Sequence, residues 1–237
     1  MMLCRKLAFL LLLLLPAAMS ATMPAGAQTA QAQAPQCRIP AQIEVQACSR
    51  PDQSRELPRG RPGDFDHYIL SLSWSPAFCA TKAGERSPVQ CRDNQFGWVV
   101  HGLWPEYRHK RDGGSWPQYC AAVQPVPAEV LRRTMCTMPD ARLMQCQWLK
   151  HGSCSDFTDP AAYFAIISRL RQRLVLPEPA PRQAAKDYAA VLAAANADKG
   201  LTVQSLRALA QDGVIREVHV CISRDFSQFI PCKQPRY

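Results

Sequence analysis

Two short segments of the sequence each place a histidine among residues that favour a fixed geometry. The first reads Val-Val-His-Gly-Leu-Trp-Pro over residues 99–105, and the second reads Trp-Leu-Lys-His-Gly-Ser-Cys over residues 148–154. Cleavage of a phosphodiester without a metal needs a group that removes a proton, a group that supplies one, and a cation that stabilises the charge on phosphorus. His101, His151 and Lys150 have the side chains for these three tasks.

The second histidine segment follows a predicted helix over residues 140–150. Because residues three and four apart share one face of a helix, Gln147, Lys150 and His151 are expected to project to the same side. A lysine at the carboxyl end of a helix is also favoured by the helix dipole. The same spacing turns Trp148 away from these groups, so this tryptophan is expected in the core.

The first histidine segment follows an apolar, β-branched run that predicts a strand over residues 97–101. Gly102 and Pro105 are expected to end this strand and to leave His101 at its carboxyl end. From there His101 can face the lysine and histidine of the second segment across a cleft. Trp104 offers a flat surface that can bind a nucleobase or hold His101 in position.

The remaining elements indicate one α+β domain whose strands come from both ends of the sequence. Hydrophobic periodicity and capping residues predict the boundaries. Asp159 is the expected cap of the strongest helix, and Thr202 is the expected cap of the last one. Further strands are predicted over residues 65–74, 215–223 and 226–232, and further helices over residues 128–135, 160–174, 183–196 and 203–211.

Residues 1–27 have the order of a cleaved secretory signal. A basic pair precedes an apolar run over residues 7–15, and small residues at 25–27 form a cleavage site. The apolar run is shorter than the ~20 residues of a membrane-spanning helix. We therefore expect a secreted or periplasmic protein without stable membrane association after cleavage.

The mature chain is expected to hold an irregular lead-in over residues 28–64 and a single folded domain over residues 65–237, acting as a monomer. Loss of residues 1–27, which carry two basic and no acidic residues, lowers the formal charge from +9 to +7. A positive balance suits a polyanionic partner such as RNA, and it suits a merely basic exported protein equally well.

Ten cysteines remain in the mature chain, an even number that favours disulfides in an oxidising compartment. A zinc site is the rival interpretation, but the sequence has no close CxxC pair, and export disfavours it. We expect no metal. Sequence does not determine connectivity, although spacing favours the pairs Cys37–Cys48, Cys79–Cys91, Cys136–Cys146 and Cys221–Cys232, which leaves Cys120–Cys154.

The two segments together resemble the active-site segments of the ribonuclease T2 family, as HGLWP followed by W-x-K-H-G-S-C. Residues 65–79 resemble the first core strand of that family, and residues 217–221 resemble its late strand with a cysteine. The resemblance implies a central antiparallel sheet packed with several helices and stabilised by disulfides. It also implies an endoribonuclease that cleaves single-stranded RNA through a 2′,3′-cyclic phosphate, with low base specificity and no cofactor.

Carried onto this chain, the resemblance makes His151 the base on the ribose 2′-hydroxyl and His101 the acid for the leaving 5′-oxygen. Lys150 then stabilises the charged phosphorane. The family usually has His-Glu before the tryptophan of the second segment, whereas this chain has Cys146 and Gln147. Gln147 can still donate a hydrogen bond to a phosphate oxygen, but it cannot take up a proton.

These departures leave two further hypotheses beside the active ribonuclease. One is a catalytically impaired relative that binds RNA or a protein partner. The other is a metal-dependent hydrolase that uses His101, Cys146 and His151, which is disfavoured because Cys146 has a better explanation as a disulfide cysteine.

Outside the two segments, basic and aromatic residues are candidates for substrate binding. Arg108 and Lys110 follow the first segment and are predicted to contact RNA phosphates. Trp74 is expected in the core, at the border of a base-binding pocket. His67 and His219 lie on predicted strands and are interpreted as core or rim residues.

Overall fold

Residues 37–45, 48, 60–109 and 116–232 are described by the structure, which is a computed structural model. They belong to one compact unit that begins at Pro35. The predicted signal over residues 1–27, most of the lead-in and Lys110 lie outside the described residues. No helix among the described residues is long and apolar enough to cross a membrane.

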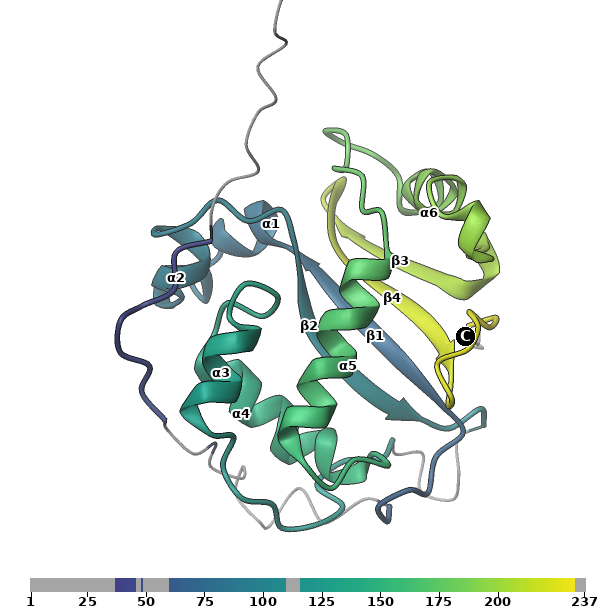
Figure 1. Ribbon diagram of the computed structural model, residues 1–237. Coiled ribbons are helices and arrows are strands. Elements are labelled where there is room, and N and C mark those ends of the chain that lie inside the picture. Colours follow the sequence, from purple (N-terminus) through teal and green to yellow (C-terminus); the bar gives the residue numbers. More distant parts are fainter. Residues whose placement is uncertain (1–36, 46–47, 49–59, 110–115, 233–237) are drawn as a thin grey trace, which may run out of the picture. The chain divides into compact units, whose positions relative to one another are not determined.

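A four-stranded antiparallel sheet organises this unit (Figure 1). Its strands are β1 (His67–Trp74), β2 (Trp98–Glu106), β3 (Leu206–Gln211) and β4 (Val214–Ser223), in the order β2-β1-β4-β3. Strands from the first and the last thirds of the described chain therefore lie side by side. The structure confirms the α+β class and the central antiparallel sheet.

The helices pack mainly against the two ends of the strand order. In Figure 1, α5 crosses in front of β2 and β1, and α6 lies beside β3. Asp159 caps α5 as predicted, because its carboxylate accepts the backbone N–H groups of Ala161 and Ala162. The helices are α1 (Ser75–Cys79), α2 (Pro88–Cys91), α3 (Ala128–Thr134), α4 (Ala141–Lys150), α5 (Pro160–Arg173) and α6 (Ala185–Ala194), with short 3-10 turns at Gly84–Arg86, Gly152–Cys154, Ala197–Lys199 and Val203–Ser205.

The two faces of the sheet have different roles because successive residues of a strand point to opposite sides. On β1, Tyr68, Leu70 and Leu72 are fully buried in the hydrophobic core that α5 also enters. His67 and Ile69, which alternate with them, point to the opposite face and line a cavity. One face of the sheet thus stabilises the fold, and the other carries the candidate site.

Residues 203–211 form no helix, contrary to the prediction. After a 3-10 turn over Val203–Ser205, strand β3 pairs with β4. The connection is Asp212-Gly213, and both residues have positive φ, of 52° and 75°. Asp-Gly between two strands favours the two-residue hairpin turn, and this tertiary pairing outweighs the helical pattern. Thr202 makes no cap with the backbone and instead pairs with the Ser205 hydroxyl at 3.0 Å.

The sequence predicted that strand β2 ends at Gly102, and this prediction is wrong. The strand continues to Glu106, and Pro105 lies opposite Tyr68 on β1. Proline is tolerated there because β2 is an edge strand of the sheet. The later prediction of a strand over residues 226–232 reduces to an isolated bridge between Ile222 and Phe229.

Three of the five predicted disulfides are confirmed, and two are wrong. The structure pairs Cys37 with Cys136 and Cys48 with Cys146, at sequence separations of 99 and 98. The confirmed pairs are Cys79–Cys91, Cys120–Cys154 and Cys221–Cys232.

The described part of the lead-in explains the two wrong pairings, because its residues contact α3 and the segment after α2. The Arg132 guanidinium on α3 donates hydrogen bonds to the carbonyls of Pro40 and Ala41. Farther back, the backbone N–H of Arg38 donates to Asn94. Each lead-in cysteine therefore lies beside a cysteine about a hundred residues later, which spacing along the chain could not reveal.

Candidate active site

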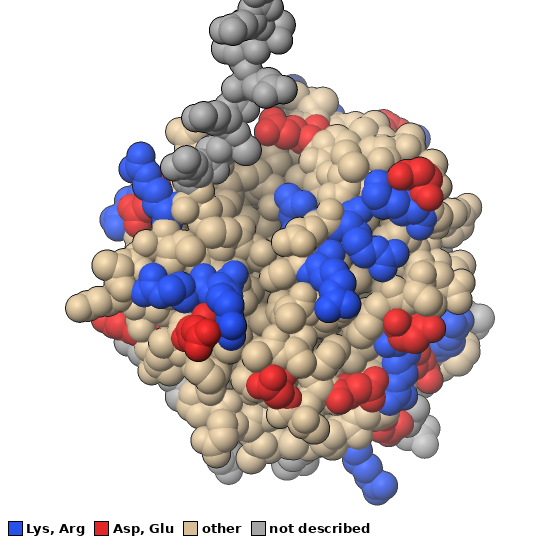
Figure 2. Space-filling view, in the orientation of Figure 1, with Lys and Arg blue, Asp and Glu red and all other residues tan. Residues whose placement is uncertain are grey.

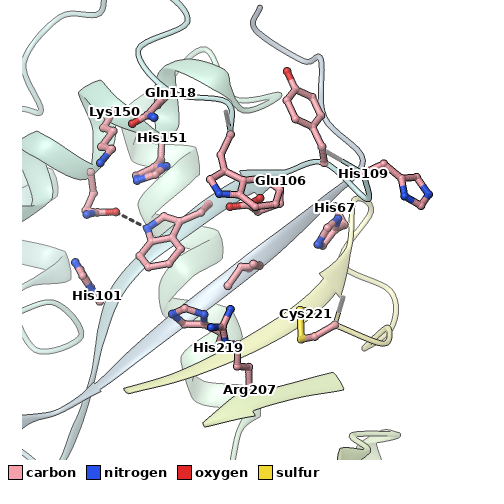
Figure 3. Close-up of a pocket in the computed structure, with 16 residues that line it drawn as sticks. His67, His101, Glu106, His109, Gln118, Lys150, His151, Arg207, His219 and Cys221 are labelled. Atoms are coloured by element: carbon pink, nitrogen blue, oxygen red, sulfur yellow. Dashed lines mark hydrogen bonds between the residues drawn. A yellow bond between two sulfur atoms is a disulfide. The ribbon is translucent and has the colours of Figure 1, made fainter. Parts of the chain in front are cut away.

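A cavity of about 970 Å³ opens on the face of the sheet opposite the hydrophobic core. All five histidines of the chain line it, together with residues from all four strands and from the end of α4 (Figure 3). The lining residues are His67, Ile69, His101, Trp104, Glu106, Tyr107, His109, Trp116, Gln118, Gln147, Lys150, His151, Arg207, His219, Cys221 and Cys232.

His101 reaches the cavity from a break in the β2 ladder. Ser71 of β1 lies opposite Gly102, whereas Leu72 lies opposite Val100, so His101 is an extra residue without a partner in the register. Such a bulge bends a strand and redirects a side chain, and bulges occur often beside active sites. The imidazole is about one-third exposed, and its Nδ1 lies 3.6 Å from a carboxylate oxygen of Glu217.

The end of α4 supplies three further groups. Gln147, Lys150 and His151 all line the cavity, which confirms that they share a face. Trp148 is buried on the other side, as predicted. Gly152 begins the 3-10 turn after the helix and lies against the Trp148 ring, which a Cβ at this position would overlap.

Trp104 is the centre of the histidine cluster. Its ring stacks with His151 at 5.4 Å between centroids and makes T-shaped contacts with His101 and His219, at centroid distances of 5.4 and 5.1 Å. The indole N–H donates to Oε1 of Gln147 at 2.8 Å, the dashed line in Figure 3. Trp104 therefore contacts His101, His151 and Gln147, which is the geometry that its predicted positioning role requires.

The hydrogen bond between Trp104 and Gln147 explains Gly102. A Cβ at this glycine would overlap both the Gln147 amide oxygen and the indole nitrogen. Because an indole N–H can only donate, the oxygen of the Gln147 amide faces Trp104. The NH₂ group of the same amide therefore points away from Trp104. A hydrogen bond from Gln147 to a phosphate oxygen would need such a donor.

His151 is held in its neutral form. Burial, the positive charge of Lys150 and the neighbouring His101 all lower its pKa well below the ordinary value. Its Nδ1 is buried and has no hydrogen-bond partner among the described residues. A neutral imidazole can accept a proton at once, which suits the base of a proton-transfer reaction.

Glu217 and His219 are two residues near the site that the sequence motifs did not mark, although their strand pattern is simple. Val218 and Val220 of β4 are buried in the core. Glu217 and His219 alternate with them, so both must lie on the opposite face. The Nε2 atom of His219 lies 2.6 Å from Oε1 of Glu217. His219 thus lines the cavity, in contact with the Glu217 carboxylate.

The other end of the cavity contains a second buried pair, His67 and Glu106, which lie opposite each other on β1 and β2. Burial raises the pKa of Glu106 to about 8, so this carboxyl group keeps its proton at neutral pH. Burial and the nearby Arg108 lower the pKa of His67, against an opposing effect of Asp66. Both side chains are therefore neutral near pH 7.

The substrate-binding candidates are only partly brought together. Trp104 lies at the centre of the cavity, but Trp74 does not line it and packs on Trp98 at 5.4 Å. Arg108 is exposed, and its backbone N–H donates to Asp66. Lys110 lies outside the described residues. His109 lines the cavity, so this segment does reach the site through one of its residues.

Positive charge is not confined to the cavity. Figure 2 shows Lys and Arg side chains gathered over the carboxyl end of α5, whose last turn carries Arg171 and Arg173. Both guanidinium groups donate to backbone carbonyls, of Trp98 and Phe226. These charges lie on a helix that packs against the core face of the sheet, away from the cavity. The positive net charge of the chain therefore does not indicate where RNA would bind.

The described residues contain no group of three or more His, Cys, Asp or Glu side chains arranged to hold a metal ion. The alternative set of His101, Cys146 and His151 fails for a direct reason. Cys146 forms a disulfide with Cys48, so its sulfur is not available as a thiolate ligand.

The fold and the paired histidine segments define a family. The model of the Ribonuclease T2 family matches residues 65–232, and the chain belongs to this family. A protein named Ribonuclease from Aeromonas hydrophila is 30% identical over 186 residues, covering 73% of this chain and 79% of that protein. A Probable ribonuclease from Haemophilus influenzae is 40% identical over 153 residues, covering 57% of this chain and 56% of that protein.

Ribonuclease I of Escherichia coli is 29% identical over 148 residues, covering 47% of this chain and 55% of that protein. The matches to the Haemophilus and Escherichia proteins thus span little more than half of each relative. A solved structure of RNase NT in complex with 5′-AMP shares the fold, with a TM-score of 0.55 and 22% identity over 73% of this chain and 94% of that chain.

Proposed function

We propose that the protein is an exported endoribonuclease that cleaves single-stranded RNA without a metal, through a 2′,3′-cyclic phosphate and with low base specificity. One observation carries the proposal: a single cavity joins Lys150 to two imidazoles in opposite environments. His151 is buried beside a cation, whereas His101 faces the Glu217 carboxylate. Two titratable groups whose environments differ in this way suit a base and an acid.

In the first step His151 takes the proton of the ribose 2′-hydroxyl, and the 2′-oxygen forms a bond to phosphorus. Lys150 and the Gln147 amide stabilise the negative charge that develops on the phosphate oxygens. The bond from phosphorus to the 5′-oxygen breaks while His101 gives its proton to that oxygen. The products are a 2′,3′-cyclic phosphate and a free 5′-hydroxyl.

In the second step the two histidines exchange roles. His101 accepts a proton from water, the water oxygen attacks phosphorus, and His151 returns its proton to the 2′-oxygen as the ring opens. The product is a 3′-phosphate, and both histidines return to their initial states. The nucleophile is the 2′-hydroxyl of the substrate in the first step and water in the second. His101 and His151 carry every proton that is transferred in the two steps.

The expected compartment follows from chemistry outside the cavity. Five disulfides join the ten cysteines of the mature chain, and disulfides persist in oxidising compartments. Together with the signal predicted over residues 1–27, they support secretion or a periplasmic location. We also infer a monomeric enzyme, because a single copy of the chain supplies the acid, the base and the cation.

The second candidate is a catalytically impaired protein that binds RNA in the same cavity. Gln147 favours it, because this side chain cannot carry the charge that a glutamate brings to the same position. Measurement of RNA affinity and RNA cleavage on one preparation separates the two functions. Binding without products supports the impaired protein, and turnover supports the enzyme.

The test is digestion of RNA with excess chelator, followed by analysis of the product ends. Cyclic phosphates and 5′-hydroxyls are expected at undiminished rate, and loss of cleavage on chelation contradicts the mechanism. His101→Ala and His151→Ala are each expected to lower kcat by about 10²- to 10⁴-fold. Lys150→Ala is expected to lower activity as well, whereas Lys186→Ala, a matched change on the exposed side of α6, is expected to leave it unchanged.

A further inference from the structure

Glu217 lies beside two of the cavity-lining histidines and is fixed by contacts that use its two oxygens differently. Oε1 accepts a hydrogen bond from the Ser71 hydroxyl at 2.6 Å and lies 2.6 Å from Nε2 of His219. Oε2 lies 3.6 Å from Nδ1 of His101. Two anchors on one oxygen thus orient the carboxylate and direct the other oxygen toward the candidate acid.

The carboxylate is kept ionised by this arrangement. Burial raises the pKa of Glu217, but its contacts with His101, His219 and Ser71 outweigh burial and lower the pKa well below the ordinary value. An ionised carboxylate beside an imidazole favours the protonated ring and fixes which ring nitrogen carries hydrogen toward it. With Nδ1 directed at Glu217, Nε2 of His101 is free to face a leaving oxygen.

Within the part of the chain that the structure describes, the other elements packed against β4 bring no second carboxylate to Glu217. Strand β1 contributes the Ser71 hydroxyl, and β3 places Arg207 opposite His219. The 3-10 turn at Val203–Ser205 and helix α1 also contact β4, and neither contains a charged residue. Among the described residues, the titratable groups in contact with Glu217 are therefore His101 and His219, while Arg207 lies opposite His219 on β3.

We propose that Glu217 is the positioning residue of the general acid: it holds His101 so that its proton is aimed at the leaving 5′-oxygen. The proposal rests on the proposed function, since it assumes that His101 is the acid. In this proposal the carboxylate that acts in the site comes from β4, about seventy residues after α4. Helix α4 itself contributes the neutral amide of Gln147. The 3.6 Å separation is expected to shorten when substrate closes the site, as catalytic hydrogen bonds commonly do.

The experiment compares two substrates that differ in their need for an acid. A dinucleotide has an alkoxide leaving group that must be protonated, whereas a nucleoside 3′-(4-nitrophenyl phosphate) releases a stable phenolate. Glu217→Gln is expected to lower kcat on the dinucleotide by about 10- to 100-fold, with KM changed less than about twofold, and to leave the aryl ester nearly unaffected. The basic limb of the dinucleotide pH profile is expected to move to lower pH.

Parallel measurements on His101→Ala separate failure of this proposal from failure of the proposed function. Selective loss on the dinucleotide in His101→Ala supports the acid role, and equal loss on both substrates overturns it. If His101→Ala is selective while Glu217→Gln loses equally on both substrates, or on neither, the positioning role is wrong. A purely structural role of Glu217 predicts equal loss and an unchanged pH profile.

Two variants control for folding. Glu129→Gln makes the same chemical change at an exposed carboxylate on α3 and is expected to leave both activities unchanged. Glu217→Asp keeps the charge but shortens the side chain, so it is expected to restore part of the dinucleotide activity and the basic limb. If Glu217→Gln fails to fold, Glu217→Asp alone remains decisive, because a smaller selective loss supports the proposal and a non-selective loss overturns it.

Discussion

Glu106→Gln tests the raised pKa of a carboxyl group that lines the cavity. Glu106 is buried on β2, with 9% of its surface exposed, and burial raises its pKa from 4.5 to about 8. The folded protein therefore keeps this carboxyl group protonated over a pH range in which the unfolded chain ionises it. Glutamine has nearly the same shape as the protonated acid and carries no proton to lose.

The sign and size of the effect follow from this difference. Below about pH 4.5 both states are protonated, and ionisation contributes nothing to the free energy of unfolding. Between about pH 4.5 and 8 only the unfolded chain loses the proton, so the wild type becomes less stable as pH rises. Each unit of pKa difference corresponds to ~1.4 kcal/mol, so the loss in the free energy of unfolding approaches an upper limit of about 5 kcal/mol at pH 8 and above.

The assay is urea unfolding of both proteins, with disulfides intact, at intervals from pH 4 to pH 9. The stability of Glu106→Gln relative to the wild type is expected to increase across this range, by several kcal/mol in total. Glu129→Gln, at an exposed carboxyl group, is expected to show no such trend. A difference between Glu106→Gln and the wild type that stays constant with pH would refute the buried, protonated state.

The remaining predictions concern the helix end and its supports. Gln147→Glu keeps an acceptor for Trp104 but adds negative charge near His151, so the pKa of His151 rises and the acidic limb of the kcat/KM profile moves to higher pH. Gly102→Ala places a Cβ on the bond between Gln147 and Trp104, and a loss of about 1–3 kcal/mol in the free energy of unfolding is expected, with reduced turnover. Joint replacement of Cys48 and Cys146 by serine is expected to cost about 2–4 kcal/mol in the same measurement. Peptide mapping of the oxidised wild type is expected to recover Cys48 linked to Cys146, and recovery of a local pair would contradict the structure.

The features that the sequence determined are local. A three-to-four residue spacing was enough to predict that Gln147, Lys150 and His151 share a face, because helix geometry fixes that relation within a few residues. Asp159 was recognisable as a cap for the same reason. Short separations of 12 and 11 residues correctly predicted Cys79–Cys91 and Cys221–Cys232. The same spacing argument failed for Cys37 and Cys48, whose partners lie about a hundred residues away.

Only the tertiary structure decided how distant segments meet. The bulge at His101 depends on the register between β1 and β2, and the approach of Glu217 depends on β4 joining the same sheet. The partner of Cys146 depends on where the lead-in lies along the helices. Periodicity reports which face of an element is buried but not which element covers it or at which register, and these long-range pairings place the acid beside its carboxylate.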